Sequence, residues 1–118
     1  MNKELDLQQL ESKIVKWHYD RNLIFGATDL SQHKKLVEES DELYQSIKAG
    51  TSPIDDIGDM IVVLINIATR NNLTLTECVQ HAYDDIKDRK GMMIMGQFVK
   101  EDDLVCIDGV YSRRVNEG

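Results

Sequence analysis

Residues 52–70, SPIDDIGDMIVVLINIATR, decide the fold, because they hold the longest apolar run of the chain beside a group of acids. Ser52 is a suitable N-cap, Pro53 suits the first position of a helix, and Asp55 completes a box-like Ser-x-x-Asp start. From Met60 to Ile65 every residue is apolar, so no face of the helix is left for water. The stretch therefore predicts a central, buried helix.

Three more helices are predicted around it. Residues 3–22 and the stretch from about Leu30 to Ala49 carry apolar side chains three and four positions apart, and Gly50 stands where a left-handed C-cap is needed. A Thr74–Glu77 capping box opens a last helix that runs towards Gly91. The pattern predicts an all-α four-helix bundle. The side chains expected to face its core from these three helices are Leu7, Leu10, Ile14, Trp17, Leu36, Leu43, Ile47, Val79, Ala82, Tyr83 and Ile86.

After Gly91 the pattern changes from helical to alternating. Residues 92–99 around Gly96, and 105–111 around Gly109, resemble short strands that flank a turn. We expect a short C-terminal β-hairpin-like tail with one or two hairpins, or an oligomerisation arm. The predicted organisation is a helical bundle over residues 1–91 and an arm over residues 92–118 of the same domain.

Composition narrows the class of protein. The chain has 118 residues, 42% of them hydrophobic and 30% charged, which predicts one globular domain. Its net charge of −7 argues against general binding to nucleic acid, which needs a basic face. The longest apolar run is much shorter than the ~20 residues that cross a bilayer, and no signal peptide is visible. The two cysteines lack metal-ligand spacing, so we expect reduced thiols in a soluble, cytoplasmic protein without a membrane partner.

Two groups of acids are the candidate site. Glu39 and Glu42 lie three apart on the second predicted helix, and Asp56 and Asp59 lie three apart on the third, so each pair shares a helix face. A short connection through Gly50 makes the two helices antiparallel neighbours, which brings the pairs face to face.

Carboxylates gathered in this way repel one another unless a cation lies between them. Oxygen-only ligands suit a hard cation such as Mg²⁺. No histidine follows these acids at a spacing of three residues, which argues against a redox iron site of the Glu-x-x-His kind. The alternative is that the acids form solvated helix faces. Gly58 favours the site, because glycine inside a helix costs about 1 kcal/mol against alanine and suggests close approach of another group.

The spacing of the acids resembles a known motif. Glu38-Glu39-x-x-Glu42, thirteen residues, and Asp56-x-x-Asp59 resemble the EExxE…ExxD motif of the MazG-like, all-α nucleoside triphosphate pyrophosphohydrolases, with Asp56 in place of the usual Glu. The similarity covers about residues 10–101. Further stretches that resemble the family, and its compact phage-type members, are Lys35-Leu36, Gly58-Asp59, Asn66, Ala68, Lys87-Asp88-Arg89-Lys90-Gly91, Gly96 and Phe98-Val99-Lys100.

The resemblance implies Mg²⁺-dependent hydrolysis of a nucleoside triphosphate to its monophosphate and pyrophosphate, with Mn²⁺ as a substitute ion. In that family the matching acids hold magnesium, which assigns Glu39, Glu42, Asp56 and Asp59 to the metal. Glu38 matches an extra leading Glu that binds a second ion or orients water. A carboxylate not fully engaged with metal accepts a proton from the attacking water, so Glu38 and Glu39 are the catalytic candidates.

Several residues are candidate substrate contacts, and each has a structural alternative. Lys35, Lys87 and Arg89 suit phosphates, although basic residues at a helix C-terminus also complement the helix dipole. Trp17 and His18 suit a stacked base, although Trp17 also fits the core stripe, which we favour. Asn66 is either a hydrogen-bonding residue between helices or a nucleotide contact, and the motif favours the nucleotide.

Three other functions remain open at this stage. The chain is alternatively a dUTPase/dCTPase-like enzyme or a phosphoribosyl-ATP pyrophosphatase relative on the same bundle. A third alternative is a non-catalytic helical interaction module that keeps the acids as a structural magnesium site or a nucleic-acid mimic. By analogy with similar bundles, we expect a homo-oligomer, either a dimer or a tetramer.

Overall fold

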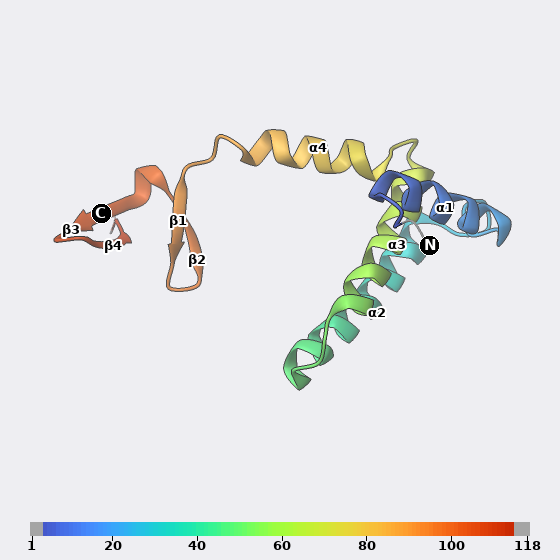
Figure 1. Ribbon diagram of the computed structural model, residues 1–118, viewed down its shortest axis with the longest axis horizontal. Helices are drawn as coiled ribbons and strands as arrows, with labels where there is room; N and C mark the ends of the chain where they lie inside the picture. The colour runs from blue at the N-terminus through green and yellow to red at the C-terminus, as the bar shows by residue number, and fades with distance from the viewer. Residues whose placement is uncertain (1–3, 115–118) are drawn as a thin grey trace. The chain divides into compact units, whose positions relative to one another are not determined.

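A computed structural model describes residues 4–114, so the predictions for residues 1–3 and for the end of the tail, 115–118, lie outside it. The chain is mostly helical with two small antiparallel hairpins near its C-terminus, which confirms a helical protein with a β tail (Figure 1). By its internal contacts the chain divides into two compact units after Gln80. The elements are α1 (Leu7–Asp20), α2 (Asp29–Ala49), α3 (Ile54–Arg70), α4 (Leu75–Ile86), β1 (Gly91–Ile94), β2 (Gln97–Lys100), a 3-10 turn (Glu101–Asp103), β3 (Leu104–Ile107) and β4 (Val110–Arg113).

Helix α3 is the centre of the first unit, as its apolar sequence predicts. It packs against both α1 and α2, and it buries Val63, Ile65 and Ala68. The helix begins one residue later than expected, with Pro53 as its N-cap and without a side-chain capping bond. Ser52 contributes differently, because its hydroxyl accepts a 3.4 Å hydrogen bond from the Ile54 backbone N–H.

Helices α2 and α3 form an antiparallel pair, which Figure 1 shows as two helices side by side joined by a short loop. Thr28 and Ser31 close a reciprocal capping box at the start of α2, with both bonds 3.0 Å long. At its end Gly50 has the left-handed conformation, φ 72°, that the sequence predicts. The short connection then turns the chain directly back into α3.

The expected core is only partly buried within the described chain. Leu7, Trp17, Ile47 and Tyr83 were expected to face the core, but all four are exposed. Helix α4 buries none of its residues. An amphipathic face becomes buried only where another element covers it, and the sequence pattern does not say which element that is. No helix in residues 4–114 has the length and apolar character needed to span a bilayer.

The second unit contains two hairpins, in agreement with the one or two hairpins predicted from the sequence. Strands β1 and β2 pair with Met92 opposite Val99, and β3 and β4 pair with Val105 opposite Ser112. Each hairpin turns through two residues with positive φ, Met95-Gly96 and Asp108-Gly109, the conformation of a type I′ turn. Arg113 donates a 3.2 Å hydrogen bond to the Gln97 side chain, which links the two hairpins.

Candidate metal centre

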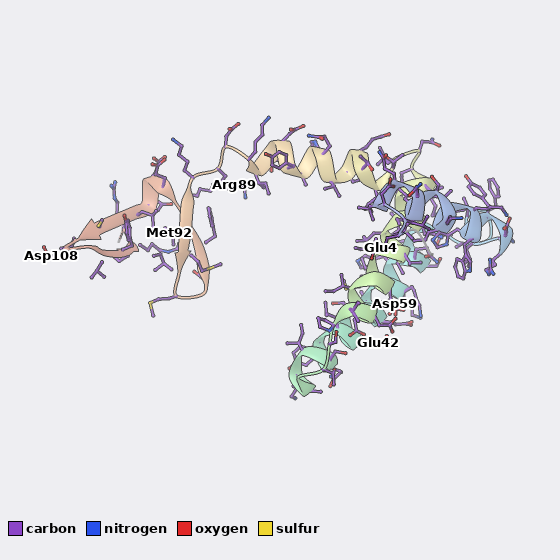
Figure 2. The ribbon with its side chains drawn as sticks, viewed as in Figure 1. Glu4, Glu42, Asp59, Arg89, Met92 and Asp108 are labelled. Atoms are coloured by element: carbon purple, nitrogen blue, oxygen red, sulfur yellow. The ribbon has the colours of Figure 1, made fainter. Side chains whose placement is uncertain are left out.

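The α2–α3 pair brings three predicted ligands together. Glu39 and Glu42 come from α2, and Asp59 comes from α3. Each offers a carboxylate oxygen, and these oxygens all lie within 4.8 Å of one another. Figure 2 labels Glu42 and Asp59 on the two packed helices. We call Glu39, Glu42 and Asp59 the acidic triad.

Glu39 is the buried member of the triad, with 6% of its surface exposed. Its Oε1 lies 3.2 Å from the Lys35 ammonium group. Its Oε2 is buried and has no hydrogen-bond partner. A buried polar atom without a partner costs about 1–3 kcal/mol, and more when it is charged. A buried oxygen of this kind, inside a group of acids, is suited to be the ligand of a cation.

The triad also resists full ionisation. A hydrogen bond with Glu39 and the negative charge of Glu39 raise the pKa of Glu42. Burial, followed by repulsion from Asp55 and Glu39, raises the pKa of Asp59. A divalent cation between these oxygens would offset the negative charge that contributes to both shifts.

The donor set fits magnesium. The three ligands are carboxylates from two rigid helices, and no histidine or cysteine belongs to the group. Hard cations such as Mg²⁺ and Mn²⁺ prefer oxygen donors, whereas zinc sites are usually built with nitrogen or sulfur. Magnesium also keeps several waters, so three protein ligands leave room for water or for phosphate oxygens.

The other two predicted acids lie beside the triad. Asp56 is buried, but no oxygen of it belongs to the close group, although its charge helps to raise the pKa of both Glu42 and Asp59. Glu38 is half exposed on α2, with a carboxylate oxygen 3.7 Å from the Lys35 ammonium group. Three of the four predicted metal ligands are therefore adjacent, and Asp56 is not part of their close group.

His18 and Asn66 lie inside the first unit, 2% and 0% exposed. The His18 Nε2 is 3.0 Å from the Val62 carbonyl oxygen, which can only accept, so this nitrogen carries the proton. The Asn66 amide then donates to His18 Nδ1 at 3.3 Å and to the Leu23 carbonyl at 3.0 Å. Of the two alternatives for Asn66, the structure contains the hydrogen bond between helices, and neither side chain is open to solvent.

Trp17 does not fill the core, contrary to the interpretation favoured from the sequence. It is 43% exposed, and the Arg21 guanidinium lies 4.5 Å from the centre of its ring. A half-exposed indole with a cation on one face keeps surface for a further stacking partner.

Lys87 and Arg89 belong to the second unit. Lys87 pairs with Asp84 at 3.5 Å, and Arg89 pairs with Asp85 at 3.2 Å. Both pairs are on the surface, where such interactions contribute about 0–1 kcal/mol each. The two basic groups are thus held only weakly by their present partners.

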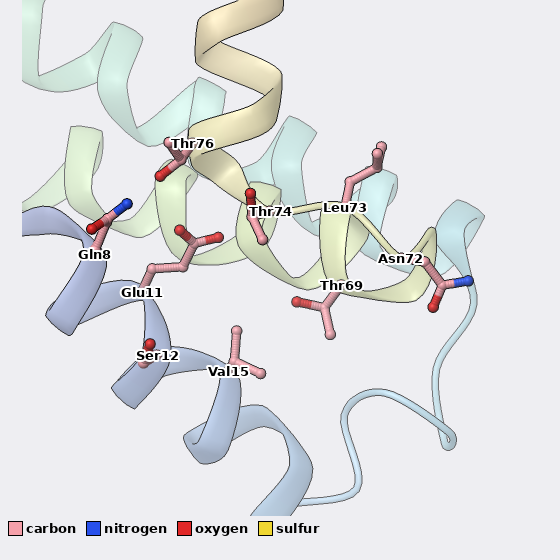
Figure 3. A pocket seen from close by; sticks show the side chains of 9 residues that line it. All are labelled: Gln8, Glu11, Ser12, Val15, Thr69, Asn72, Leu73, Thr74 and Thr76. Carbon is pink, nitrogen blue, oxygen red and sulfur yellow. The ribbon is translucent and has the colours of Figure 1, made fainter.

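A separate pocket of about 690 Å³ lies between α1 and the end of α3 with the start of α4 (Figure 3). Its buried carboxylate, Glu11, accepts a hydrogen bond from the Leu75 N–H at the first turn of α4. Glu11 was not among the predicted site residues, because no local pattern shows that a residue will cap a helix 64 positions further along. The lining residues are Gln8, Glu11, Ser12, Val15, Thr69, Asn72, Leu73, Thr74 and Thr76.

Comparison with known proteins finds one curated relative, from Haemophilus phage HP1 (strain HP1c1). It is described as an uncharacterized 18.2 kDa protein in the rep-hol intergenic region, and it is 39% identical over 70 residues. The match covers 58% of this chain and 43% of the phage protein, so the chain spans less than half the length of that relative. No family model and no solved structure matches the chain. The chain is therefore similar over part of its length to a phage protein whose name states no activity.

Proposed function

We propose that the chain is a magnesium-dependent nucleoside triphosphate pyrophosphohydrolase of the MazG-like kind. The observation that carries the proposal is the acidic triad, whose three carboxylates each offer an oxygen within 4.8 Å of the others, and whose buried member, Glu39, has an oxygen without a hydrogen-bond partner. The spacing of the acids in the sequence supports it independently, through the resemblance to the EExxE…ExxD motif.

In this proposal Glu39, Glu42 and Asp59 hold the ion directly, and the buried Asp56 adds negative charge near them. When bound, Mg²⁺ or its substitute Mn²⁺ supplies positive charge that attracts triphosphate oxygens and offsets charge on the leaving pyrophosphate. The carboxylates fix where that charge lies, because they extend from two packed helices.

The remaining residues act on the substrate and the attacking water. Glu38 is half exposed beside the triad, so it is the better placed of the two catalytic candidates to accept a proton from water that attacks the α-phosphorus. Lys35 binds phosphate oxygens, and the exposed Trp17 ring stacks on the base. Lys87 and Arg89, which belong to the second unit, are further candidates for phosphate binding.

The proposed assembly is a four-helix bundle completed within a homo-oligomer, either a dimer or a tetramer. Support comes from apolar side chains that stay half exposed in one chain, on α3 (Ile57 and Leu64) and on α4 (Val79, Tyr83 and Ile86). Apolar patches of this kind usually mark an interface.

Hydrolysis in oxygen-18 water tests the reaction. Each nucleoside and deoxynucleoside triphosphate is incubated with the protein and Mg²⁺, and the products are separated. We expect the label on the monophosphate, intact pyrophosphate, and no reaction with chelator. Label in orthophosphate would contradict attack at the α-phosphorus, and a strong preference for dUTP, dCTP or phosphoribosyl-ATP would favour those relatives. If no nucleotide is hydrolysed, the result would favour the alternative of a non-catalytic helical interaction module.

A further inference from the structure

Lys35 supplies the positive charge nearest to the acidic triad. Its ammonium nitrogen lies 3.2 Å from Glu39 Oε1 and 3.7 Å from Glu38 Oε2. No other basic side chain of residues 4–114 forms an ion pair with an acid of the site. A single positive charge therefore balances only part of the negative charge of these carboxylates.

The ammonium group satisfies only part of Glu39. It contacts Oε1, whereas Oε2 stays buried without a partner. The two partners also differ in freedom, because the Glu39 side chain is 8% exposed and the Lys35 side chain is 51% exposed. Glu39 is therefore fixed in the protein, and the long Lys35 stem can turn into solvent at low cost.

Ordinary helix stabilisation explains the pair poorly. Lys35 precedes Glu39 by four residues, and at this spacing the order with Glu first is the more favourable one. The position of Lys35 relates more closely to the buried carboxylate than to the stability of α2.

We propose that Lys35 is an exchangeable counter-ion of the metal centre. It pairs with the Glu39 carboxylate when no divalent cation is bound, moves away from that carboxylate when the cation binds, and then contacts a phosphate of the substrate. The inference rests on the proposed metal site, and it assigns to Lys35 a step that couples cation binding to substrate binding.

Elementary electrostatics gives the direction of each effect. A divalent cation bound to Glu39 and the Lys35 ammonium group, 3.2 Å from Oε1 of the same carboxylate, repel each other at short distance. Removal of the ammonium group therefore favours the cation. Once displaced, the same group is close to the cation that attracts the phosphates, so its removal disfavours an anionic ligand. A residue that only stabilises α2 would give neither effect.

The experiment compares Lys35→Met with Lys34→Met in the full chain. Lys34 is the exposed neighbour of Lys35 and has no ion pair among the described residues. Its substitution therefore removes the same charge one position away. Calorimetric titration with Mg²⁺ measures cation affinity without nucleotide. Titration at saturating Mg²⁺ with α,β-methylene deoxynucleoside triphosphates, one purine and one pyrimidine, measures ligand affinity. Circular dichroism checks that each variant is folded.

We expect Lys35→Met to bind Mg²⁺ about tenfold more tightly than the wild type. It should bind the preferred methylene analogue about tenfold more weakly. Lys34→Met should change either affinity less than about twofold, since it is only a surface charge. A gain in Mg²⁺ affinity together with a loss of nucleotide affinity is the result that the exchange predicts.

Unchanged or weaker Mg²⁺ binding by Lys35→Met would overturn the exchange. If the wild type nevertheless binds Mg²⁺ and hydrolyses nucleotides, the proposed function stands without the exchange. If the wild type neither binds Mg²⁺ nor hydrolyses any nucleotide, the proposed function and the exchange fail together.

Discussion

Among single residues, Asp59 shows most directly how a group of neighbouring acids lowers the stability of the folded protein. Burial and neighbouring negative charges raise the pKa of Asp59, so its ionised form is held at a cost. The same holds for Glu42, whose pKa is raised by Glu39. For an acid with a raised folded pKa, the native state binds protons more readily, and stability falls as pH rises through that pKa.

Asp59→Asn tests this cost. Without Mg²⁺ the variant should melt at the same or a higher temperature than the wild type at pH 7, because one repelling charge is removed. With millimolar Mg²⁺ the wild-type melting temperature should rise and that of the variant should not, since only the folded wild type binds the ion. Thermal denaturation followed by circular dichroism measures both. Asp41→Asn, an exposed acid outside the triad, is the control and should respond to Mg²⁺ like the wild type.

Trp17 is the second residue whose role can be measured directly, because the chain has a single tryptophan. Trp17→Phe should lower the free energy of unfolding by less than about 1 kcal/mol, well under the ~3–5 kcal/mol of a core truncation. A methylene nucleotide with Mg²⁺ should change the wild-type fluorescence. Unchanged emission at saturating nucleotide would remove Trp17 from the substrate site.

At the scale of elements, long-range polar contacts hold α1 against its neighbours. His18 and Asn66 join α1, α3 and the loop at Leu23, and Glu11 joins α1 to the start of α4. These contacts use buried polar groups, and few apolar side chains are buried among residues 4–114, so each contact contributes much to the position of its helix.

Glu11→Ala should destabilise the protein by about 1–2 kcal/mol, because the Leu75 N–H loses its acceptor at a helix start. Glu11→Gln should cost less, since its amide oxygen still accepts that bond. Urea denaturation measures the difference, and Ser12→Ala on the same pocket wall is the control. Equal losses for both Glu11 variants would show that charge matters more than the capping bond.

The His18 contact predicts a pH dependence. Burial lowers the pKa of His18 below its ordinary 6.5, more than the bond to the Val62 carbonyl raises it. The unfolded chain therefore takes up a proton first as pH falls through 6.5, and stability drops by up to about 1.4 kcal/mol per pH unit below that value. His18→Gln should lose this slope between pH 7.5 and about 5.5 in urea denaturation. A wild type with no slope in this range would contradict the buried neutral imidazole.

For the whole molecule, the distribution of apolar surface predicts association. Leu64 on α3 and Val79 and Tyr83 on α4 belong to amphipathic faces, but they are half exposed in one chain. We expect light scattering to give the mass of a dimer or tetramer, and Leu64→Glu to shift it towards the monomer. Leu30→Glu, at an exposed position at the start of α2, should leave the mass unchanged. A monomeric wild type at all concentrations would reject the homo-oligomer.

The local features of the chain were predictable from residues close together in sequence. Apolar spacing located the four helices, Gly50 ended α2 with positive φ, and the Met95-Gly96 and Asp108-Gly109 turns produced both hairpins. The acidic pairs on adjacent helices were predictable for the same reason, because spacing of three residues along a helix fixes a shared face. These features depend on backbone preferences and periodicity, which a sequence contains in full.

The tertiary structure decided what lies between elements. It placed Asp59 with Glu39 and Glu42 but left Asp56 out of their close group, it paired His18 with Asn66 across 48 positions, and it left Trp17 half exposed. Each of these outcomes depends on the rotation and offset of one helix against another. Periodicity leaves those two quantities free, and the packing of side chains from distant parts of the chain determines them.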